Sequence, residues 1–161
     1  MPEQTRTAKA DPASRPTRIA AAGQTVITLL LLAAFVSGAL VWWGKRLQLQ
    51  EGVSPSWLLG ALVVHGSLNP ALCALFGYLL CHHIRVGWQM RANLLSGFFM
   101  EAVFAGQILT GVGLYYAGSE AFRGALSSIH SVLGVLLPVG LAWHWWSGLR
   151  WARRQAEAGR T

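Results

Sequence analysis

Four long apolar runs constrain the fold of this chain most strongly. They extend approximately over residues 26–43, 57–81, 94–116 and 125–146. Each run is close to the roughly 20 helical residues that cross the apolar part of a bilayer. Helix is the economical conformation for such a run, because in lipid every backbone N–H and C=O must be satisfied within the segment. The sequence therefore predicts an all-α fold, a four-helix transmembrane bundle.

Charge is scarce and unevenly placed. Only 12% of the residues are charged and 53% are apolar, whereas about a quarter of an ordinary soluble chain is charged. This composition excludes intrinsic disorder and a secreted disulfide scaffold. The net charge of +7 does not indicate nucleic acid binding, because no basic stripe is interleaved with aromatic residues. We expect a basic N-terminal tail (1–23), the membrane domain (24–152) and a C-terminal tail (153–161).

The basic residues predict an orientation. If the N-terminus is cytoplasmic, ten of the thirteen Lys and Arg residues lie on the inner side, and only Lys45, Arg46 and Arg123 lie outside. Cytoplasmic segments of membrane proteins carry the excess of Lys and Arg. Both termini are therefore expected in the cytoplasm.

All five histidines lie in the second and fourth runs or at their ends. His130 and His144 are separated by roughly 21 Å and about 40° of a regular helix, whereas His65 and His83 are separated by roughly 27 Å and share a face. The second and fourth helices of an up-down bundle run in the same direction. We therefore expect His65 opposite His130 (the first pair) and His83 opposite His144 (the second pair), at two depths.

Two facing imidazoles at each of two depths are what axial ligation of two stacked b-type haems requires. Ligation by two histidines fills both axial positions and favours electron transfer over oxygen chemistry. His65, His83, His130 and His144 are thus candidate ligands of haem iron. The separation on the second helix is roughly 6 Å larger than that on the fourth, and His82 remains an alternative to His83.

Other uses of these histidines stay open. Covalent haem is excluded, because Tyr78 stands where the first cysteine of a Cys-x-x-Cys-His motif would precede Cys81 and His82. A non-haem metal-dependent membrane reductase could use the same rings, although thiolates and carboxylates near them are scarce. In a haem-free membrane anchor or transport subunit, the histidines would instead make hydrogen-bonded contacts between helices.

Glu101 is the one acidic residue well inside an apolar run. A carboxyl group at that depth is costly, so it is a functional hypothesis by default. It would suit the proton transfer that accompanies quinone chemistry, or it hydrogen-bonds a neighbouring helix. Glycines of the last three runs are open to two interpretations, close approach of a flat macrocycle or helix packing: Gly66, Gly77, Gly97, Gly106, Gly111, Gly113, Gly134 and Gly140.

Three stretches carry a family resemblance: HGSLNPALCALFGYLLCHHIRVGW, LTGVGLYYAGSEAFRG and IHSVLGVLLPVGLAWHWWSGLRW. They cover most of residues 57–151. The chain resembles the four-helix cytochrome b superfamily, which includes the membrane cytochrome b subunits of bacterial nickel–iron hydrogenases and formate dehydrogenases, and a group of small bacterial cytochrome b-like proteins. The first helix departs from family versions that use a ligand there, because it has no histidine.

The resemblance implies two non-covalent haems b held by the four histidines of the two pairs. It implies a multi-pass protein of the bacterial inner membrane that exchanges electrons between the quinone pool and a redox partner. That partner would be a c-type cytochrome, an iron–sulfur protein or a flavin protein. The chain would then be an electron-transfer subunit of an oxidoreductase complex rather than a complete enzyme.

Overall fold

The computed structural model describes residues 19–158, and its regular structure there is entirely helical. In chain order the elements are α1 (Ala21–Glu51), α2 (Leu58–Leu79), the π-helix η2 (Leu80–Ile84), α3 (Arg85–Gln89), α4 (Leu94–Tyr116) and α5 (Glu120–Ala158). The elements α2, η2 and α3 form one rod over Leu58–Gln89. With α1, α4 and α5 it makes four helical rods, within the described residues, that are long and apolar enough to cross a membrane. The predicted all-α, four-helix transmembrane fold is confirmed.

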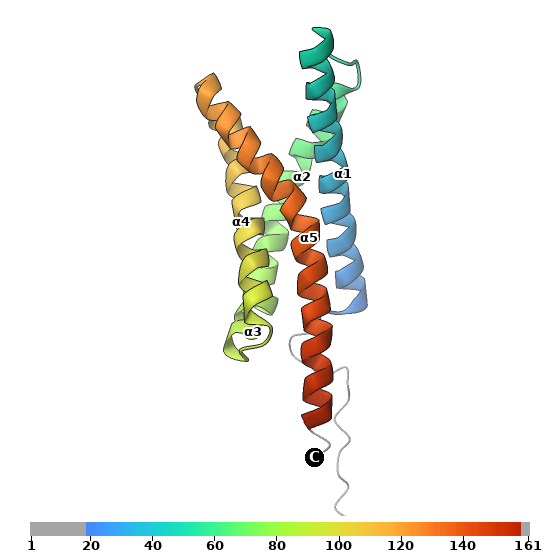
Figure 1. Ribbon diagram of the computed structural model, residues 1–161, viewed down its shortest axis with the longest axis vertical. Helices are drawn as coiled ribbons and strands as arrows, with labels where there is room; N and C mark the ends of the chain where they lie inside the picture. Colours follow the sequence, from blue (N-terminus) through green and yellow to red (C-terminus); the bar gives the residue numbers. More distant parts are fainter. Residues whose placement is uncertain (1–18, 159–161) are drawn as a thin grey trace, which may run out of the picture.

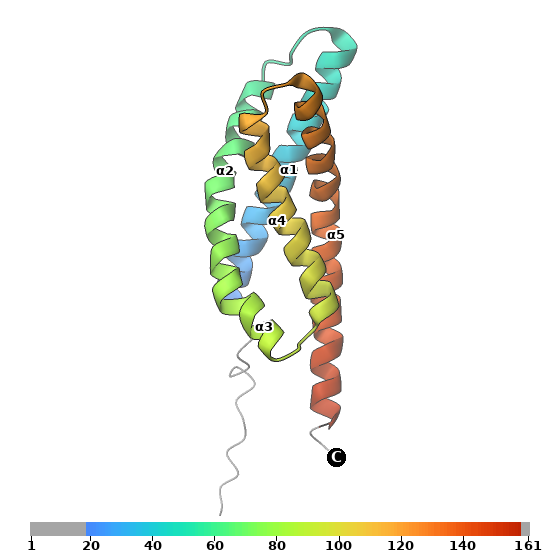
Figure 2. The ribbon, with the colours of Figure 1, turned by 90° about the vertical axis from the view of Figure 1, so that its left-hand side faces the viewer.

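The helices pack as two hairpins, α1 with α2 and α4 with α5, which share the most extensive contacts. Figure 1 shows the two hairpins diverging at the end that holds the α1–α2 and α4–α5 connections. The start of α1, helix α3 and the end of α5 lie at the opposite end (Figures 1 and 2). Helices α2 and α5 run in the same direction, as the up-down arrangement requires.

The helices are longer than the apolar runs that predict them. Helix α1 continues past Trp43 to Glu51 and ends at Gly52, whose φ of 73° is left-handed and whose N–H bonds the Gln48 carbonyl. Helix α5 continues to Ala158, beyond the predicted domain end at residue 152. Hydropathy marks where a helix leaves lipid, but its backbone hydrogen bonds continue equally well in water until a cap ends them. Residues 1–18 of the predicted N-terminal tail lie outside the described residues.

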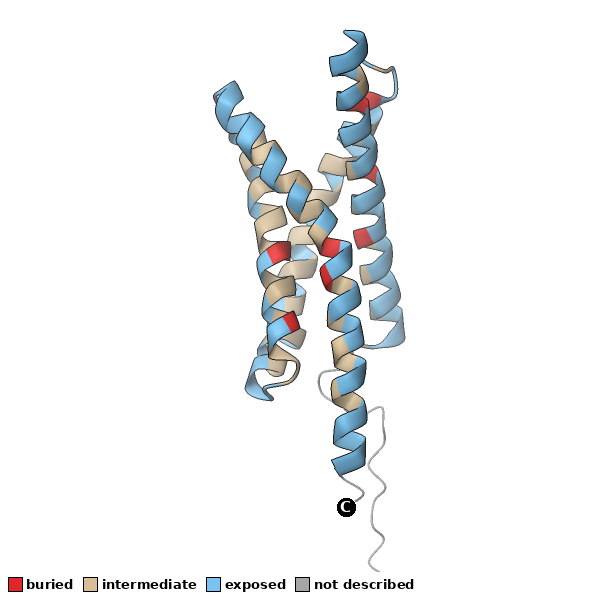
Figure 3. Cartoon of the chain, in the orientation of Figure 1, coloured by how far each residue is buried: buried red, intermediate tan, exposed pale blue. Residues whose placement is uncertain are grey.

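A small apolar core lies at the centre of the described bundle. Leu31, Val103, Phe104 and Leu137 are buried together, and Phe76 meets Phe104 edge-on with ring centroids 5.3 Å apart. Figure 3 shows how few residues are buried and how much of each helix is exposed. This pattern leaves long apolar surfaces without a protein partner in the described chain.

Those exposed surfaces are apolar along all four rods. Leu59 and Leu109, for example, are both 71% exposed. Soluble monomers rarely expose contiguous apolar patches larger than a few hundred Å². Lipid is the environment that would cover these surfaces, and the chain is a multi-pass membrane protein.

The turn between α4 and α5 fixes how these two helices face each other. Arg123 of α5 donates hydrogen bonds to the carbonyls of Leu114 (3.3 Å) and Ala117 (2.7 Å) at the end of α4. The Ser119 hydroxyl accepts the N–H of Phe122 at 3.3 Å. The last carbonyls of α4 and the first N–H groups of α5 thus gain partners that the helices themselves lack.

Candidate cofactor site with two histidine pairs

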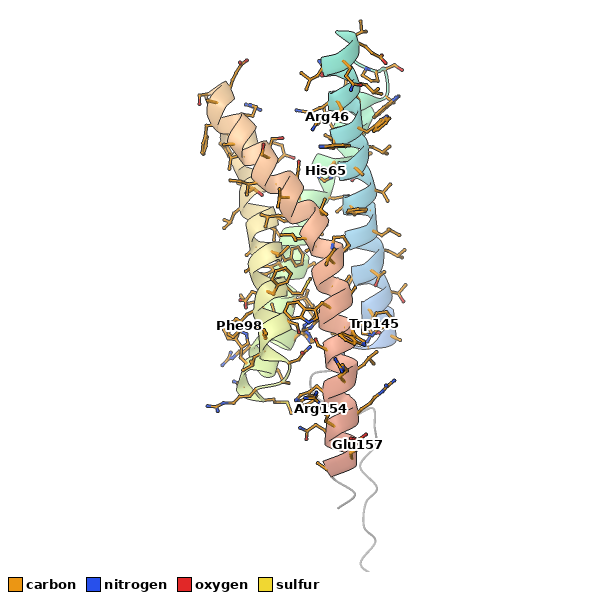
Figure 4. The ribbon with its side chains drawn as sticks, viewed as in Figure 1. Arg46, His65, Phe98, Trp145, Arg154 and Glu157 are labelled. Atoms are coloured by element: carbon orange, nitrogen blue, oxygen red, sulfur yellow. The ribbon has the colours of Figure 1, made fainter. Side chains whose placement is uncertain are left out.

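The structure brings the histidines together in the two pairs that their spacing predicts. In the first pair the rings of His65 (α2) and His130 (α5) have centroids 6.0 Å apart and planes at 80°. In the second pair the rings of His83 (η2) and His144 (α5) have centroids 6.1 Å apart and planes at 88°. Figure 4 labels His65, which lies nearer to the end of the bundle that holds the α1–α2 connection.

The rod that carries His65 and His83 departs from a regular α-helix at two places. Pro70 interrupts it, and residues Leu80–Ile84 form a π-helix. A π-turn closes its hydrogen bond over five residues rather than four, so it places more residues in each turn and shortens the rod. A proline inside a helix also removes one backbone donor and bends the axis.

His82 and His83 are neighbours in this π-helix, but their rings have different contacts. The His82 ring turns away from α5 and stacks on Tyr78, with centroids 4.6 Å apart and planes at 19°. Its Nδ1 lies 3.0 Å from the Tyr78 carbonyl oxygen. Of the two candidates for the second pair, the structure therefore brings His83 and not His82 to His144.

A serine or threonine hydroxyl lies beside Nδ1 in three of the four paired rings. The distance from Nδ1 to the hydroxyl oxygen is 3.0 Å for His65 and Ser37, 2.9 Å for His130 and Thr110, and 3.1 Å for His144 and Ser96. All three hydroxyls come from α1 or α4, the two membrane-spanning rods that carry no histidine. Each of these three imidazoles is therefore held by the partner helix of its own hairpin.

A glycine follows each of these hydroxyl residues and lies against the same ring. A Cβ atom added to the glycine would lie 2.9 Å from Cε1 of His65 at Gly38, 3.4 Å from Cε1 of His130 at Gly111, and 3.9 Å from Cε1 of His144 at Gly97. The closest of these distances leaves no room for a side chain. A hydroxyl–glycine dipeptide is therefore repeated three times, each time against one imidazole.

Sequence analysis missed the hydroxyls and gave the first helix no part in the site. A signal was available. Ser96 and Thr110 are fourteen residues apart, as are His130 and His144. Antiparallel neighbouring helices bring equal separations face to face, so the two spacings together could have indicated both contacts. No such spacing is available for the single contact of Ser37.

The apolar core separates the two pairs. Leu137 of the core lies seven residues from His130 and seven from His144 on α5. The edge-on contact of Phe76 with Phe104 belongs to the same layer. The pairs are thus two distinct sites with a water-excluding layer between them.

The donor set of each site consists of two imidazoles. Within residues 19–158, no three His, Cys, Asp or Glu side chains gather in a group that could hold a metal ion. Two metal–nitrogen bonds of about 2 Å each, together with the two ring radii, span roughly 6 Å, which matches both centroid separations. Each pair therefore fits a metal ion whose other ligands come from a cofactor, and haem iron held by two axial histidines is such an ion.

The remaining candidates lie apart from these contacts. Glu101 is partly exposed on α4, and the hydrogen bonds that hold the histidine rings do not include it. Its role in proton transfer stays a prediction. Cys73 and Cys81 are both free thiols, and the Cys73 sulfur lies 4.0 Å from Oδ1 of Asn69.

Comparison of the chain with protein-family models, with curated proteins and with solved structures found no match in any of the three.

Proposed function

We propose that this protein is a membrane b-type cytochrome that carries electrons between two haems. His65 and His130 would hold one haem iron, and His83 and His144 the other. The observation that carries the proposal is the presence of two imidazole pairs with nearly equal ring separations, 6.0 and 6.1 Å. Haem iron with two axial imidazoles supplies reversible one-electron chemistry.

The chain's own residues would hold the cofactor and keep water away from it. The glycines beside the rings bring backbone close to three of the four imidazoles. The core layer around Phe104 and Leu137 excludes water between the two sites. Along α5 the fourteen residues between His130 and His144 correspond to a rise of roughly 21 Å, so electrons that pass between the sites would cross much of the membrane.

The charge distribution supports an orientation with both termini in the cytoplasm. At the end that holds α3 and the end of α5, the described basic residues are Arg85, Arg91, Arg150, Arg153 and Arg154. At the other end they are Lys45, Arg46 and Arg123. Figure 4 shows Arg46 and Arg154 near opposite ends of the molecule. This asymmetry agrees with the positive-inside rule for a multi-pass protein of the bacterial inner membrane.

A protein that only carries electrons needs one partner that donates them and another that accepts them. We propose that it links the quinone pool to a redox partner subunit that carries a c-type haem, an iron–sulfur cluster or a flavin. Glu101 remains the candidate for the proton that quinone chemistry requires, because it is an ionisable residue inside a membrane-spanning helix. The proposal that the chain is an electron-transfer subunit, rather than a complete enzyme, rests on its resemblance to the four-helix cytochrome b superfamily.

Optical spectroscopy of the purified chain tests the proposal. The protein is produced in cells supplied with haem, purified in detergent, and measured as a reduced-minus-oxidised spectrum with a pyridine haemochrome assay. We expect a sharp visible α-band and close to two haems per chain. A colourless protein overturns the proposal. In that case, tightly bound non-haem metal in elemental analysis would favour a metal-dependent membrane reductase, and its absence would favour a haem-free anchor or transport subunit.

A further inference from the structure

Ser37 and Thr110 use their hydroxyl groups in the same way. The Ser37 hydroxyl donates to the carbonyl of Ala33 at 2.7 Å and lies 3.2 Å from that of Ala34. The Thr110 hydroxyl donates to the carbonyl of Gly106 at 2.7 Å and lies 3.2 Å from that of Gln107. A carbonyl oxygen can only accept, so in both residues the single hydroxyl hydrogen is directed to the helix backbone.

This assignment fixes the proton on the neighbouring imidazole. Because each hydroxyl hydrogen is already used, the hydroxyl oxygen must accept the hydrogen bond from Nδ1 of the ring that it contacts. In a neutral imidazole one nitrogen is a donor and the other an acceptor. His65 and His130 therefore carry their proton on Nδ1, which leaves the lone pair on Nε2.

Ser96 differs from Ser37 and Thr110, because its hydroxyl lies in a larger group of hydrogen bonds around His144. The Ser147 hydroxyl donates to the His144 carbonyl at 3.1 Å, and Ser96 Oγ lies 2.8 Å from Ser147 Oγ. Either serine can donate to the other, and Ser96 Oγ also lies 3.4 Å from the Asn93 carbonyl, so the contact of Ser96 with Nδ1 of His144 does not fix the proton on that ring. The Asn93 side-chain amide donates to the His144 carbonyl at 3.1 Å and also lies 3.4 Å from Nδ1 of His144, toward which an amide N–H can only donate. Ser96 is only 2% exposed, so water does not compete for these bonds.

We infer that Ser37 and Thr110 are positioning residues that hold His65 and His130 in the Nδ1–H tautomer, with Nε2 as the nitrogen available to a metal ion. The inference rests on the proposed function for the identity of that metal, haem iron. Outer-shell partners of this kind fix the tautomer and orientation of a ligating histidine and raise its basicity. A more basic axial ligand stabilises the oxidised iron, so each hydroxyl lowers the midpoint potential of its haem.

The first test reads the tautomers without any cofactor. The full chain is labelled with ¹⁵N-histidine, prepared without haem in lipid bilayers and studied by solid-state NMR. We expect the Nδ1–H form for the rings of His65 and His130. Replacement of Thr110 by valine, which keeps the shape but removes the acceptor, should move the ring of His130 toward the Nε2–H form, and Thr110→Ser should restore it. Nε2–H rings in the unaltered protein overturn the inference.

The second test measures the haem. We expect Thr110→Val and Ser37→Ala to weaken haemin binding at the first pair about 10- to 100-fold and to raise the midpoint potential of that haem. Matched controls are Ser67→Ala and Ser128→Ala. Their hydroxyls also donate to the carbonyl four residues before, at 2.7 and 3.0 Å, but lie on α2 and α5 and are exposed. Unchanged affinity and potential in Thr110→Val overturn the inference.

The two tests separate the inference from the proposed function. A colourless wild-type protein in which the rings of His65 and His130 are in the Nδ1–H form overturns the haem assignment and supports the tautomers. A haem-loaded wild-type protein that is insensitive to Thr110→Val supports the haem assignment and overturns the role of the hydroxyls. Thr110→Ser guards against general misfolding, because it retains the hydroxyl and should retain both affinity and potential.

Discussion

At the scale of single residues, each histidine of the first pair is defined by contacts on three sides. His65 has the Ser37 hydroxyl at Nδ1, Gly38 at Cε1 and the ring of His130 opposite. Hydrogen bonds and steric contact together leave the ring little freedom to rotate, which is the preorganisation that a ligand site requires. The consequence is that loss of one ring should affect its own pair and spare the other.

We expect the histidines to act in pairs when they are replaced. His130→Ala should lose one of the two haems, because an iron with a single imidazole is held poorly. Adding His65→Ala to that variant should cost nothing more, since both belong to the first pair, whereas adding His144→Ala should remove the second haem. The pyridine haemochrome assay gives the number of haems per chain. If His130→Ala retained two haems, or if the His65 and His130 double variant lost both, the pairing would be wrong.

We also expect replacement of His82 and replacement of His83 to have different effects on the number of bound haems. His83→Ala should lose the haem of the second pair, because its ring is the one that meets His144. His82→Ala should retain two haems, because its ring stacks on Tyr78 instead. The two variants change the same residue type at adjacent positions, so each is the control of the other. The opposite result in the haem stoichiometry would assign the second site to His82.

At the scale of helices, the site depends on how closely each hairpin packs. Helix α1 contributes no histidine, yet it approaches α2 so closely that a Cβ at Gly38 would lie 2.9 Å from Cε1 of His65. In the rod formed by α2, η2 and α3, the π-helix Leu80–Ile84 contains His83. π-Turns occur as single-turn insertions in α-helices, frequently at functional sites. The geometry of the pairs is therefore a property of hairpins rather than of single helices.

Gly38→Ala tests this close approach. The added methyl group must displace either the His65 ring or α1, and overpacking of this kind costs about 1–3 kcal/mol. We expect a less stable protein in which the first pair loses most of its haem. Gly77→Ala is the matched control, because nothing lies within 4 Å of a Cβ at that position on α2. Denaturant titration and haem stoichiometry measure the two effects, and equal behaviour of the two variants would contradict the predicted contact.

At the scale of the whole molecule, charge and aromatic residues mark two ends. At one end the guanidinium of Arg46 lies 5.2 Å from the Trp42 ring centroid, and at the other that of Arg150 lies 4.4 Å from the ring centroid of Trp146. Tryptophan is enriched at both membrane–water interfaces, and cations are attracted to its ring face. These contacts agree with a bundle that places one end in each interface.

Cysteine labelling in intact cells tests the proposed orientation. Cys73 and Cys81 are first replaced by serine, and single cysteines are introduced at Ser54, in the α1–α2 connection, or at Ala92, in the α3–α4 connection. We expect a membrane-impermeant maleimide to label Ser54→Cys from outside the cytoplasmic membrane and to label Ala92→Cys only after the membrane is permeabilised. The reverse pattern would place the termini outside and contradict the orientation predicted from Lys and Arg.

The sequence by itself determined the fold class and the pairing of His65 with His130, and it left His83 and His82 as candidates for the partner of His144. The length of the apolar runs decides the fold class. A run that crosses lipid must satisfy its backbone hydrogen bonds within itself, as a helix does, whichever segments pack against it. Helical periodicity decides the pairing, because rise and rotation per residue are nearly constant along a regular helix. Both properties are local, so they can be predicted without knowing how the helices pack.

Only the tertiary structure decided which histidine completes the second pair and which residues hold the rings. The alternative of His82 is excluded because its ring stacks on Tyr78 while that of His83 meets His144, and hydropathy does not encode such contacts. The contact of Ser37 with His65 depends on the depth and rotation at which α1 packs on α2. Packing contacts between helices are set by shape complementarity over many side chains at once, and a linear pattern of residue types does not contain that information.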